Sequence, residues 1–367
     1  MDKGFEVYGK PSKGCQHCVR GNKLVLFITG LCSQKCAFCP VSEKKFGKDD
    51  IYANEWKIDK INDLYEEIRL MNAKGAGITG GDPLVTLNKT CTFIKKLKLK
   101  FGKNFHIHLY TPFKLVNEKT MKKLYLSGLD EIRFHPKLDD DSEWENINFA
   151  LNYDWDIGIE IPCIPGKLNQ MKKMLKFFSD KVKFVNLNEL EFSDTIVDHY
   201  NMDKYNTKDK ISYAAKGSKQ AAFQLIDYAN KNKFSCSVYF CSSYLKDKIQ
   251  MGNRIINRAK GSAKSYDIIT EEGMLIRGSI YLPELKPGLS YRDNLSLSNR
   301  KEILNKLIKI KKLISFECDI DKTKLRLICS PILIEKYKDK IKKLNLVPAI
   351  VEEYPTQDAI EIEIDFI

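Results

Sequence analysis

The sequence is organised around the stretch GLCSQKCAFCP at residues 30–40, which follows the apolar run at residues 24–28. The stretch carries Cys32, Cys36 and Cys39 in a C-x3-C-x2-C spacing. Sulfurs held this close suit a soft metal, and short cysteine spacings of this kind hold iron–sulfur clusters. Three thiolates are one fewer than a closed four-cysteine site uses, so the site would keep an open coordination position. A zinc knuckle and buried free thiols are the alternatives.

Around this stretch, apolar strand-like runs alternate with segments of helical periodicity from residue 23 onward. Such alternation is typical of β-α units built around a parallel sheet. The expected strands are residues 23–28, 75–79, 105–111, 131–135, 157–162, 183–187 and 235–240. The expected helices are residues 58–72, 90–99, 118–127, 168–178 and 218–231. The sequence therefore predicts an α/β fold of about six or seven units, fewer than the eight of a full TIM barrel.

The domain organisation follows from changes in this pattern. We expect an N-terminal cysteine-pair segment at 1–22, a barrel domain at 23–262 and a small C-terminal α/β sandwich domain at 263–367. The polar, weakly periodic segment 193–216 reads as an insertion or a lid loop. The C-terminal part, with a hairpin at 266–281 and a long helix at 298–314, shows no catalytic motif.

A glycine motif follows the second expected strand. Gly80, Gly81 and Asp82 lie about forty residues after the C-x3-C-x2-C stretch. Paired glycines let the backbone approach a ligand closely, and a carboxylate beside them can accept hydrogen bonds from an ammonium group. Alone, such a motif usually marks a turn. Its order and spacing relative to the three cysteines favour a ligand site.

Together these features resemble the radical S-adenosylmethionine (radical SAM) superfamily, in which an aromatic residue commonly precedes the third cysteine, as Phe38 does. The resemblance covers about residues 23–245 and is greatest to the branch related to pyruvate formate-lyase activating enzymes. It implies a partial (β/α)6-type TIM barrel. It also implies that Cys32, Cys36 and Cys39 hold a 4Fe-4S cluster whose fourth iron is chelated by SAM. The glycine motif would contact the SAM amino group, here with Asp82 in place of the commoner glutamate.

The resemblance also implies a chemistry. An external electron donor such as ferredoxin or flavodoxin reduces the cluster, SAM is cleaved to methionine and a 5'-deoxyadenosyl radical, and the radical abstracts hydrogen from a substrate at the barrel mouth. If the inner strand faces point into the barrel, Arg133 would pair with the SAM carboxylate, because a guanidinium matches a carboxylate. His106, His108 and Tyr110 share one strand face, and Asn186, Asn188, Glu189 and Glu191 form a polar cluster at a strand end.

A second cysteine group flanks the barrel. Cys15 and Cys18 form a C-x2-C pair before the first strand, and Cys236 and Cys241 form a C-x4-C pair at the last one. A barrel's first and last strands can lie close together, so four thiolates could bind zinc or an auxiliary iron–sulfur cluster. The alternatives are four unrelated thiols and a redox-active pair at Cys15 and Cys18.

The charge balance bears on partners. The formal net charge of +13 and a basic segment after Cys241, with Arg254 and Arg258 on one helix face, would suit RNA such as tRNA. Lysine-rich solvated helices explain the same balance equally well. We expect no membrane span, because no run of eighteen apolar residues occurs, and a cytoplasmic location, because residues 1–6 lack the apolar core of a signal peptide. Eleven cysteines then argue for metal ligands and thiols.

Three functions remain open from the sequence. The first is a radical SAM enzyme that abstracts hydrogen from an unidentified substrate, with RNA as a candidate. The second is an activase that installs a radical on a protein partner. The third is a non-enzymatic zinc or iron–sulfur protein that binds nucleic acid.

Overall fold

The computed structural model describes residues 7–367, so residues 1–6, on which the signal-peptide expectation rested, lie outside the described residues. The chain forms two compact units. The first extends to Ile68 and resumes at Ala73–Arg254, and the second comprises Arg69–Asn72 and Ile255–Ile367. The units divide inside helix α7 (Gly252–Ser262), whereas we expected the division after residue 262.

The first unit is built on one ten-stranded sheet with the order β1-β10-β9-β8-β7-β6-β5-β2-β3-β4. Its parallel strands are β2 (Lys23–Phe27), β5 (Gly75–Thr79), β6 (His106–Pro112), β7 (Glu131–His135), β8 (Asp156–Cys163), β9 (Phe184–Glu189) and β10 (Ser237–Cys241). The short antiparallel strands at its edges are β1 (Val7–Tyr8), β3 (Tyr52–Ala53) and β4 (Trp56–Lys57). The predicted strands are confirmed to within two residues at each end, and the fold is the expected α/β partial barrel.

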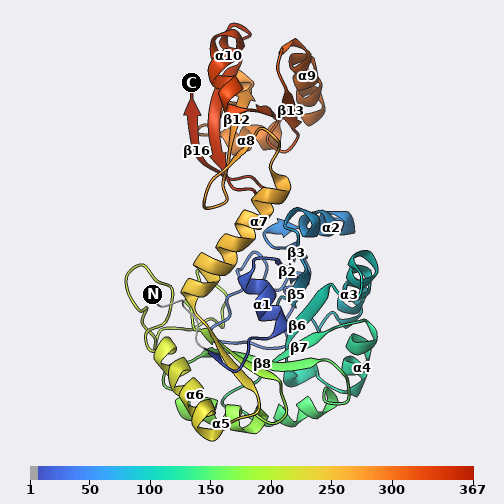
Figure 1. The fold of residues 1–367 in the computed structure, drawn as a ribbon, viewed down its shortest axis with the longest axis vertical. Helices are drawn as coiled ribbons and strands as arrows, with labels where there is room; N and C mark the ends of the chain where they lie inside the picture. Colours follow the sequence, from blue (N-terminus) through green and yellow to red (C-terminus); the bar gives the residue numbers. More distant parts are fainter. Residues whose placement is uncertain (1–6) are drawn as a thin grey trace. The chain divides into compact units, whose positions relative to one another are not determined.

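Helices cover the outer face of this sheet (Figure 1). They are α3 (Leu87–Phe101), α4 (Glu118–Leu126), α5 (Leu168–Phe178) and α6 (Ser218–Asn232), and α2 (Ile61–Leu70) precedes them in the chain. Their sequences explain their positions. In α5 the buried residues Met171, Met174, Leu175 and Phe178 recur at the spacing that gives a helix one apolar stripe. Two 3-10 turns, η1 (Phe113–Leu115) and η2 (Trp144–Phe149), complete the connections.

One helix lies inside the barrel instead of outside it. Helix α1 (Lys13–Val19) packs against β6, β5 and β2 on the inner face of the sheet (Figure 1). It begins at Ser12, whose hydroxyl oxygen accepts the N–H of Cys15 at 3.2 Å and so caps the helix. It also contacts η3 (Leu245–Met251), a π-helical turn that follows β10 and leads into α7. Cys15 and Cys18 therefore lie on a helix inside the barrel. That helix contacts the turn that follows the last strand, which ends at Cys241.

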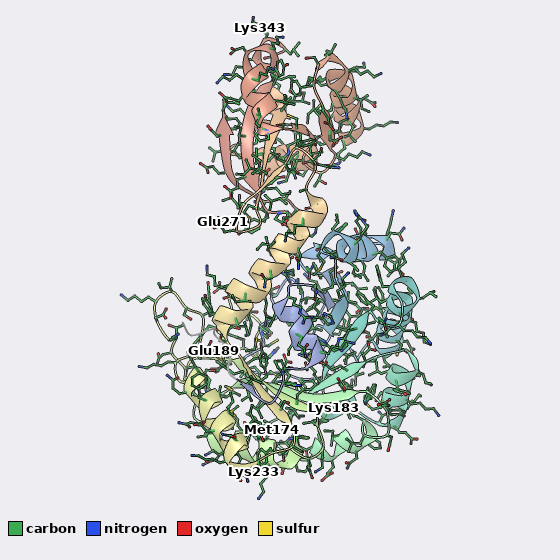
Figure 2. All side chains as sticks on the ribbon, in the orientation of Figure 1. Met174, Lys183, Glu189, Lys233, Glu271 and Lys343 are labelled. Atoms are coloured by element: carbon green, nitrogen blue, oxygen red, sulfur yellow. The ribbon has the colours of Figure 1, made fainter. Side chains whose placement is uncertain are left out.

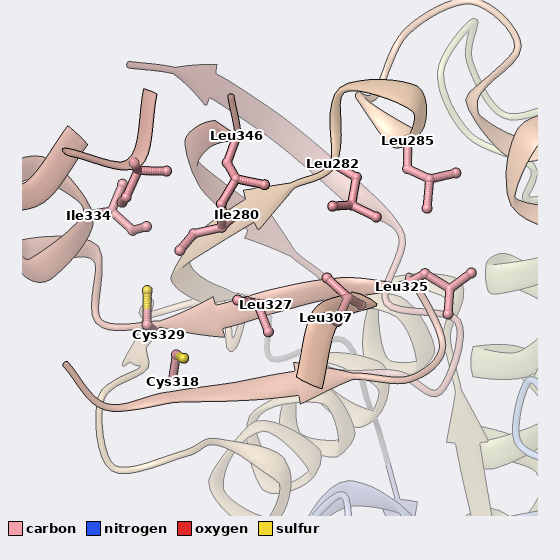
Figure 3. Close-up of a cluster of buried hydrophobic side chains, with 11 residues drawn as sticks. Ile280, Leu282, Leu285, Leu307, Cys318, Leu325, Leu327, Cys329, Ile334 and Leu346 are labelled. Atoms are coloured by element: carbon pink, nitrogen blue, oxygen red, sulfur yellow. The ribbon is translucent and has the colours of Figure 1, made fainter. Parts of the chain in front are cut away.

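The second unit is a six-stranded antiparallel sheet with helices. Its strands are β11 (Ile268–Ile269), β12 (Leu275–Tyr281), β13 (Cys318–Asp321), β14 (Arg326–Cys329), β15 (Val347–Glu353) and β16 (Glu361–Phe366), and its further elements are η4 (Pro283–Leu285), α8 (Tyr291–Leu297), α9 (Arg300–Leu313) and α10 (Pro331–Lys343). Figure 3 shows its apolar core, in which Ile280 of β12, Leu327 of β14 and Ile334 of α10 meet. Across residues 7–367, no helix has both the length and the apolar character needed to span a bilayer.

Candidate active site

The C-x3-C-x2-C cysteines lie in the loop between β2 and β3, at the carboxyl edge of the parallel sheet. Within this loop Phe38 packs on His135, the last residue of β7, with ring centroids 5.8 Å apart. Cys32 is exposed, and Cys36 and Cys39 are half-buried. Active sites of barrels built from parallel strands lie at this edge. The loop therefore stands where a barrel enzyme carries its chemistry.

The three thiols are near enough to affect one another's protonation. Burial, and after it the neighbouring Cys32 and Cys39 thiols, raises the pKa of Cys36 to about 11. Burial also raises the pKa of Cys32 and that of Cys39. The backbone N–H of Gln34 donates to Sγ of Cys32 at 3.4 Å, and hydrogen bonds to sulfur tune cluster-ligating thiolates. Three neighbouring thiols on an accessible loop fit an iron–sulfur cluster, whose binding displaces the thiol protons.

The glycine motif runs directly against this loop. Gly80, Gly81 and Asp82 follow β5, and the N–H of Gly81 donates to the carbonyl of Thr29 at 2.8 Å. Gly80 has a φ of +149°, and a Cβ there would collide with the same carbonyl. A Cβ on Gly81 would lie 2.9 Å from Cβ of Cys32. Glycine is needed at both positions because the two backbones approach so closely.

Asp82 uses its side chain to hold the cysteine loop. Its carboxylate is fully buried and accepts the hydroxyl of Ser33 at 2.7 Å, the hydroxyl of Thr111 at 2.9 Å and the N–H of Leu84 at 3.0 Å. Burial raises the pKa of Asp82 although these three hydrogen bonds oppose the rise. The carboxylate therefore links the residue after Cys32 to β6, and the glycine backbone remains the part of the motif that is free to meet a ligand.

The segment that we expected to be a lid packs over the cysteine loop. The N–H of Asn201 donates to the carbonyl of Ala37. The hydroxyls of Ser193 and Thr195 donate to the carbonyls of Pro40 and Val41, respectively. Phe38 also packs into a small apolar cluster that includes Leu190, Met202 and Ala215. The loop is thus enclosed between the ends of the strands and residues 193–216.

Arg133 does not have the surroundings that we expected of a SAM-carboxylate ligand. It is 2% exposed, and its Nε donates to Glu131 at 2.6 Å. One terminal nitrogen donates to Glu160 at 2.7 Å and to the hydroxyl of Tyr110 at 3.2 Å, and the other donates to the hydroxyl of Ser12 at 2.9 Å. The guanidinium is occupied by partners within the chain and joins α1 to the barrel wall, so its pairing with the SAM carboxylate stays a prediction.

Glu160 of β8 is the centre of a polar group that the sequence did not single out as a site. Its carboxylate accepts Asn186 at 2.9 Å and Asn188 at 3.0 Å besides Arg133. Burial raises the pKa of Glu160, but Arg133 and the two amides outweigh burial and leave the pKa below its usual value. The signal was the alternation along β8 and β9, which places these residues on one inner face.

Glu189 and Glu191, predicted with the two asparagines, belong to other contacts. Glu189 is the last residue of β9, and Lys183 directly precedes the first residue of that strand (Figure 2). Glu189 accepts the N–H of Ser243 at 2.9 Å. Glu191 forms an ion pair with Lys246. The predicted polar cluster therefore divides into a cavity-lining pair of asparagines and two carboxylates that fix the turn after β10.

Comparison with known proteins identifies the class of enzyme. Residues 26–178 match the Radical SAM superfamily. Across 98% of the chain, 40% of residues are identical to a Methanocaldococcus jannaschii protein provisionally named as a glycyl-radical enzyme activating enzyme, of which 93% is covered. The chain belongs to the radical SAM superfamily. It is therefore an enzyme, and the alternative of a non-enzymatic nucleic-acid-binding protein is wrong.

Solved radical SAM structures are more distant. Methylornithine synthase aligns with a TM-score of 0.40 and 11% identity, over 59% of this chain and 70% of its own. A radical SAM methyltransferase from Kitasatospora setae aligns with a TM-score of 0.35 and 12% identity, over 50% of this chain and 40% of its own. Members of the superfamily use a 4Fe-4S cluster and SAM, and the thiol set of the cysteine loop fits that requirement.

Three of the four cysteines in the second group come together in this radical SAM barrel. Cys15 and Cys241 are buried beside Tyr239, and Cys18 lines the same cavity. Cys236 does not join them. It lies in the bend just before β10, and it is not among the residues that line the cavity. The expected four-thiolate site is wrong in its fourth member.

A second group of ligand-type atoms lies beneath α1. His106, His108 and Glu131 are buried, with ligand atoms within 4.8 Å of one another. Two cations already adjoin them, because Lys23 Nζ lies 3.0 Å from Nε2 of His108 and Arg133 pairs with Glu131. Burial lowers the pKa of His106 to about 3 and that of His108 well below its usual value. Neutral imidazoles beside two cations indicate a structural network that supports α1.

The basic segment after Cys241 was open to two interpretations, a phosphate-binding ridge and an ordinary basic helix. Lys246 pairs with Glu191, and Arg254 pairs with Glu55. Arg258 is 5% exposed. The two arginines that share a helix face are therefore occupied or buried, which favours the ordinary basic helix.

Proposed function

We propose that Cys32, Cys36 and Cys39 ligate the 4Fe-4S cluster of this radical SAM enzyme and that the backbone of Gly80, Gly81 and Asp82 lines the amino end of SAM. One observation carries the proposal. The glycine motif and the cysteine loop are held together at the carboxyl edge of the barrel by the close approach at Gly81 and by the carboxylate of Asp82. Neither contact is needed for a turn or for buried thiols.

When bound and reduced by a donor such as ferredoxin or flavodoxin, the cluster supplies the electron that cleaves SAM to methionine and a 5'-deoxyadenosyl radical. The chain's own residues protect that radical. Residues 193–216 cover the cysteine loop, and Phe38 fills the space between that cover and His135. Excluding water and other hydrogen donors keeps the radical for the substrate.

We propose a protein as the substrate, with the enzyme acting as an activase that abstracts hydrogen from a glycyl residue of a partner. The support is the name of the Methanocaldococcus jannaschii relative, which matches nearly the whole chain. RNA loses its specific support, because Arg254 and Arg258 do not form an open basic ridge. The net charge of +13 alone does not separate the two substrate classes.

The test begins with anaerobic reconstitution, reduction by dithionite and addition of SAM. The wild-type enzyme should release 5'-deoxyadenosine, and Cys36→Ala should not. Cys236→Ser is the matched control, because it removes a cysteine that lies outside the cysteine loop, in the bend before β10. Loss of product in the control and retention in Cys36→Ala would overturn the assignment of the cluster ligands.

The substrate class is tested by giving the reduced enzyme either the protein fraction or the RNA fraction of a cell extract. A protein substrate predicts an organic-radical signal in electron paramagnetic resonance that remains with a separate polypeptide after the enzyme is removed. Stimulation of 5'-deoxyadenosine release by the RNA fraction alone, with no polypeptide radical, would refute the activase proposal.

A further inference from the structure

The barrel encloses a second group of cysteines that the reaction at the cysteine loop does not use. A cavity of about 260 Å³ lies between α1 and the strands β6 to β10. Cys15, Cys18 and Cys241 line it, together with Glu160 and Lys246. Two of the thiols come from the helix inside the barrel and the third comes from the end of β10. Segments far apart in the sequence thus bring three sulfurs to one cavity.

Side-chain amides connect these sulfurs. The Sγ of Cys18 donates to Oε1 of Gln250 at 3.0 Å, and Nε2 of the same amide donates to Sγ of Cys241 at 3.4 Å. Nδ2 of Asn186 donates to Sγ of Cys15 at 3.2 Å. Amide donors aimed at sulfur are the contacts that stabilise a thiolate bound to iron and adjust its potential.

The start of α1 is fixed by buried polar contacts. The N–H of Gly14 donates to Glu131 at 3.2 Å, and the hydroxyl of Ser12 is held by Arg133 at 2.9 Å. A Cβ on Gly14 would lie 2.5 Å from Nη2 of Arg133, so glycine allows the helix to sit this close to the strands. Burying an ion pair costs desolvation energy, so its best explanation is a gain in positional specificity. What it positions is the C-x2-C pair.

The end of α1 is fixed from the opposite side. Asn253 donates through Nδ2 to the carbonyl of Val19 at 2.7 Å. Gly21 has a φ of +67° and lies against the backbone of Asn253 and Arg254, where a Cβ would collide. Helix α1, and with it Cys15 and Cys18, is therefore fixed to β7 at its start and to the residues after β10 at its end.

We propose that Cys15, Cys18 and Cys241 bind a second iron–sulfur cluster inside the barrel, in addition to the cluster of the cysteine loop. The inference does not depend on the proposed substrate. Three thiolates would leave one iron of a 4Fe-4S cluster for a ligand from the cavity, beside Glu160 and Lys246.

Two other uses of these thiols fit less well. A structural zinc ion takes four protein ligands, whereas three thiols line this cavity and Cys236 is not among its lining residues. A set of three cysteines with one open position suits a 4Fe-4S cluster better. A redox dithiol at Cys15 and Cys18 would not account for Cys241, which lines the same cavity.

The experiment compares iron, sulfide and zinc in anaerobically reconstituted full-length variants. Wild type should hold about eight iron atoms and eight sulfides per chain, the content of two 4Fe-4S clusters. The triple variant Cys32→Ala, Cys36→Ala and Cys39→Ala should keep about half. That remaining half should show the absorbance and the resonance spectrum of a reduced cluster.

A second triple variant, Cys15→Ser, Cys18→Ser and Cys241→Ser, should also lose about half of the iron, whereas Cys236→Ser should lose none. Cys18→Ser alone is the variant to use if the triple variant does not fold, because Cys18 is only half-buried. The proposal is overturned if the cysteine-loop variant contains no iron, or if these variants hold wild-type iron. It is equally overturned if they lose about one zinc per chain, or only a disulfide between Cys15 and Cys18. Failure of the activase proposal would leave all these metal contents unchanged.

Discussion

The contact between Asp82 and the cysteine loop gives the sharpest prediction. Replacing Asp82 by alanine removes the acceptor for Ser33, Thr111 and Leu84 at once. The N–H of Leu84 lies in the interior and cannot turn to water instead, whereas the hydroxyl of Thr111 keeps the carbonyl of Pro112 as an acceptor at 3.2 Å. Ser33 is partly exposed and can rebind solvent.

The size of the effect follows from the one buried donor that loses its acceptor, the N–H of Leu84. Leaving a buried donor without a partner costs about 1–3 kcal/mol. A loss of about 2 kcal/mol changes the equilibrium between the closed and open loop by a factor of about thirty. Asp82→Ala should therefore lower the free energy of unfolding by about 2 kcal/mol and reduce cluster occupancy after reconstitution.

Urea unfolding followed by circular dichroism and iron analysis would measure both effects. Asp82→Asn is the matched control, because its Oδ1 still accepts Thr111 and Leu84 and its amide can donate to Ser33. It should lose less than about 1 kcal/mol. If Asp82→Ala unfolds within about 0.5 kcal/mol of wild type and keeps its iron, the carboxylate does not hold the loop. Equal losses in both variants would mean that charge, and not hydrogen bonding, was responsible.

Further predictions concern the network that supports α1. Arg133→Met should cost about 3–5 kcal/mol at pH 7.5, because it leaves the carboxylates of Glu131 and Glu160 buried without the cation that they share. Urea midpoints should show the loss shrinking toward pH 5.5 as a buried carboxylate takes up a proton. A loss independent of pH would contradict this reasoning. Gly14→Ala should destabilise by about 1–3 kcal/mol through overpacking, whereas Gly252→Ala, with open space around it, should stabilise by up to about 1 kcal/mol, and thermal unfolding would compare them. Burial lowers the pKa of His106 to about 3. Below about pH 6.5 the unfolded chain therefore binds a proton that the folded chain does not. The free energy of unfolding should fall by about 1.4 kcal/mol for each unit by which the pH is lowered. His106→Asn should remove that part of the pH slope, and equal slopes in urea titrations would refute it.

The strands and the active-site loop were predictable because their signals are local. An apolar run such as residues 24–28 is typical of a strand buried on both faces, and a parallel sheet covered by helices offers that environment. The cysteine spacing and the glycine pair lie within a few residues, so no knowledge of the tertiary structure was needed to connect them.

The role of Arg133 was not predictable in this way. An arginine on an inner strand face is equally compatible with a ligand carboxylate and with a carboxylate of the chain, and the choice depends on what fills the barrel. Helix α1 fills it, and nothing in residues 13–19 marks a helix that packs inside a sheet instead of outside. Its placement is decided by Gly14 meeting Arg133 and by Gly21 meeting Asn253, contacts between segments more than one hundred residues apart. Arg133 on the inner face of the barrel holds α1 in place. This fixed position keeps the thiols of Cys15 and Cys18 at the cavity that Cys241 also lines, as the proposed second cluster needs.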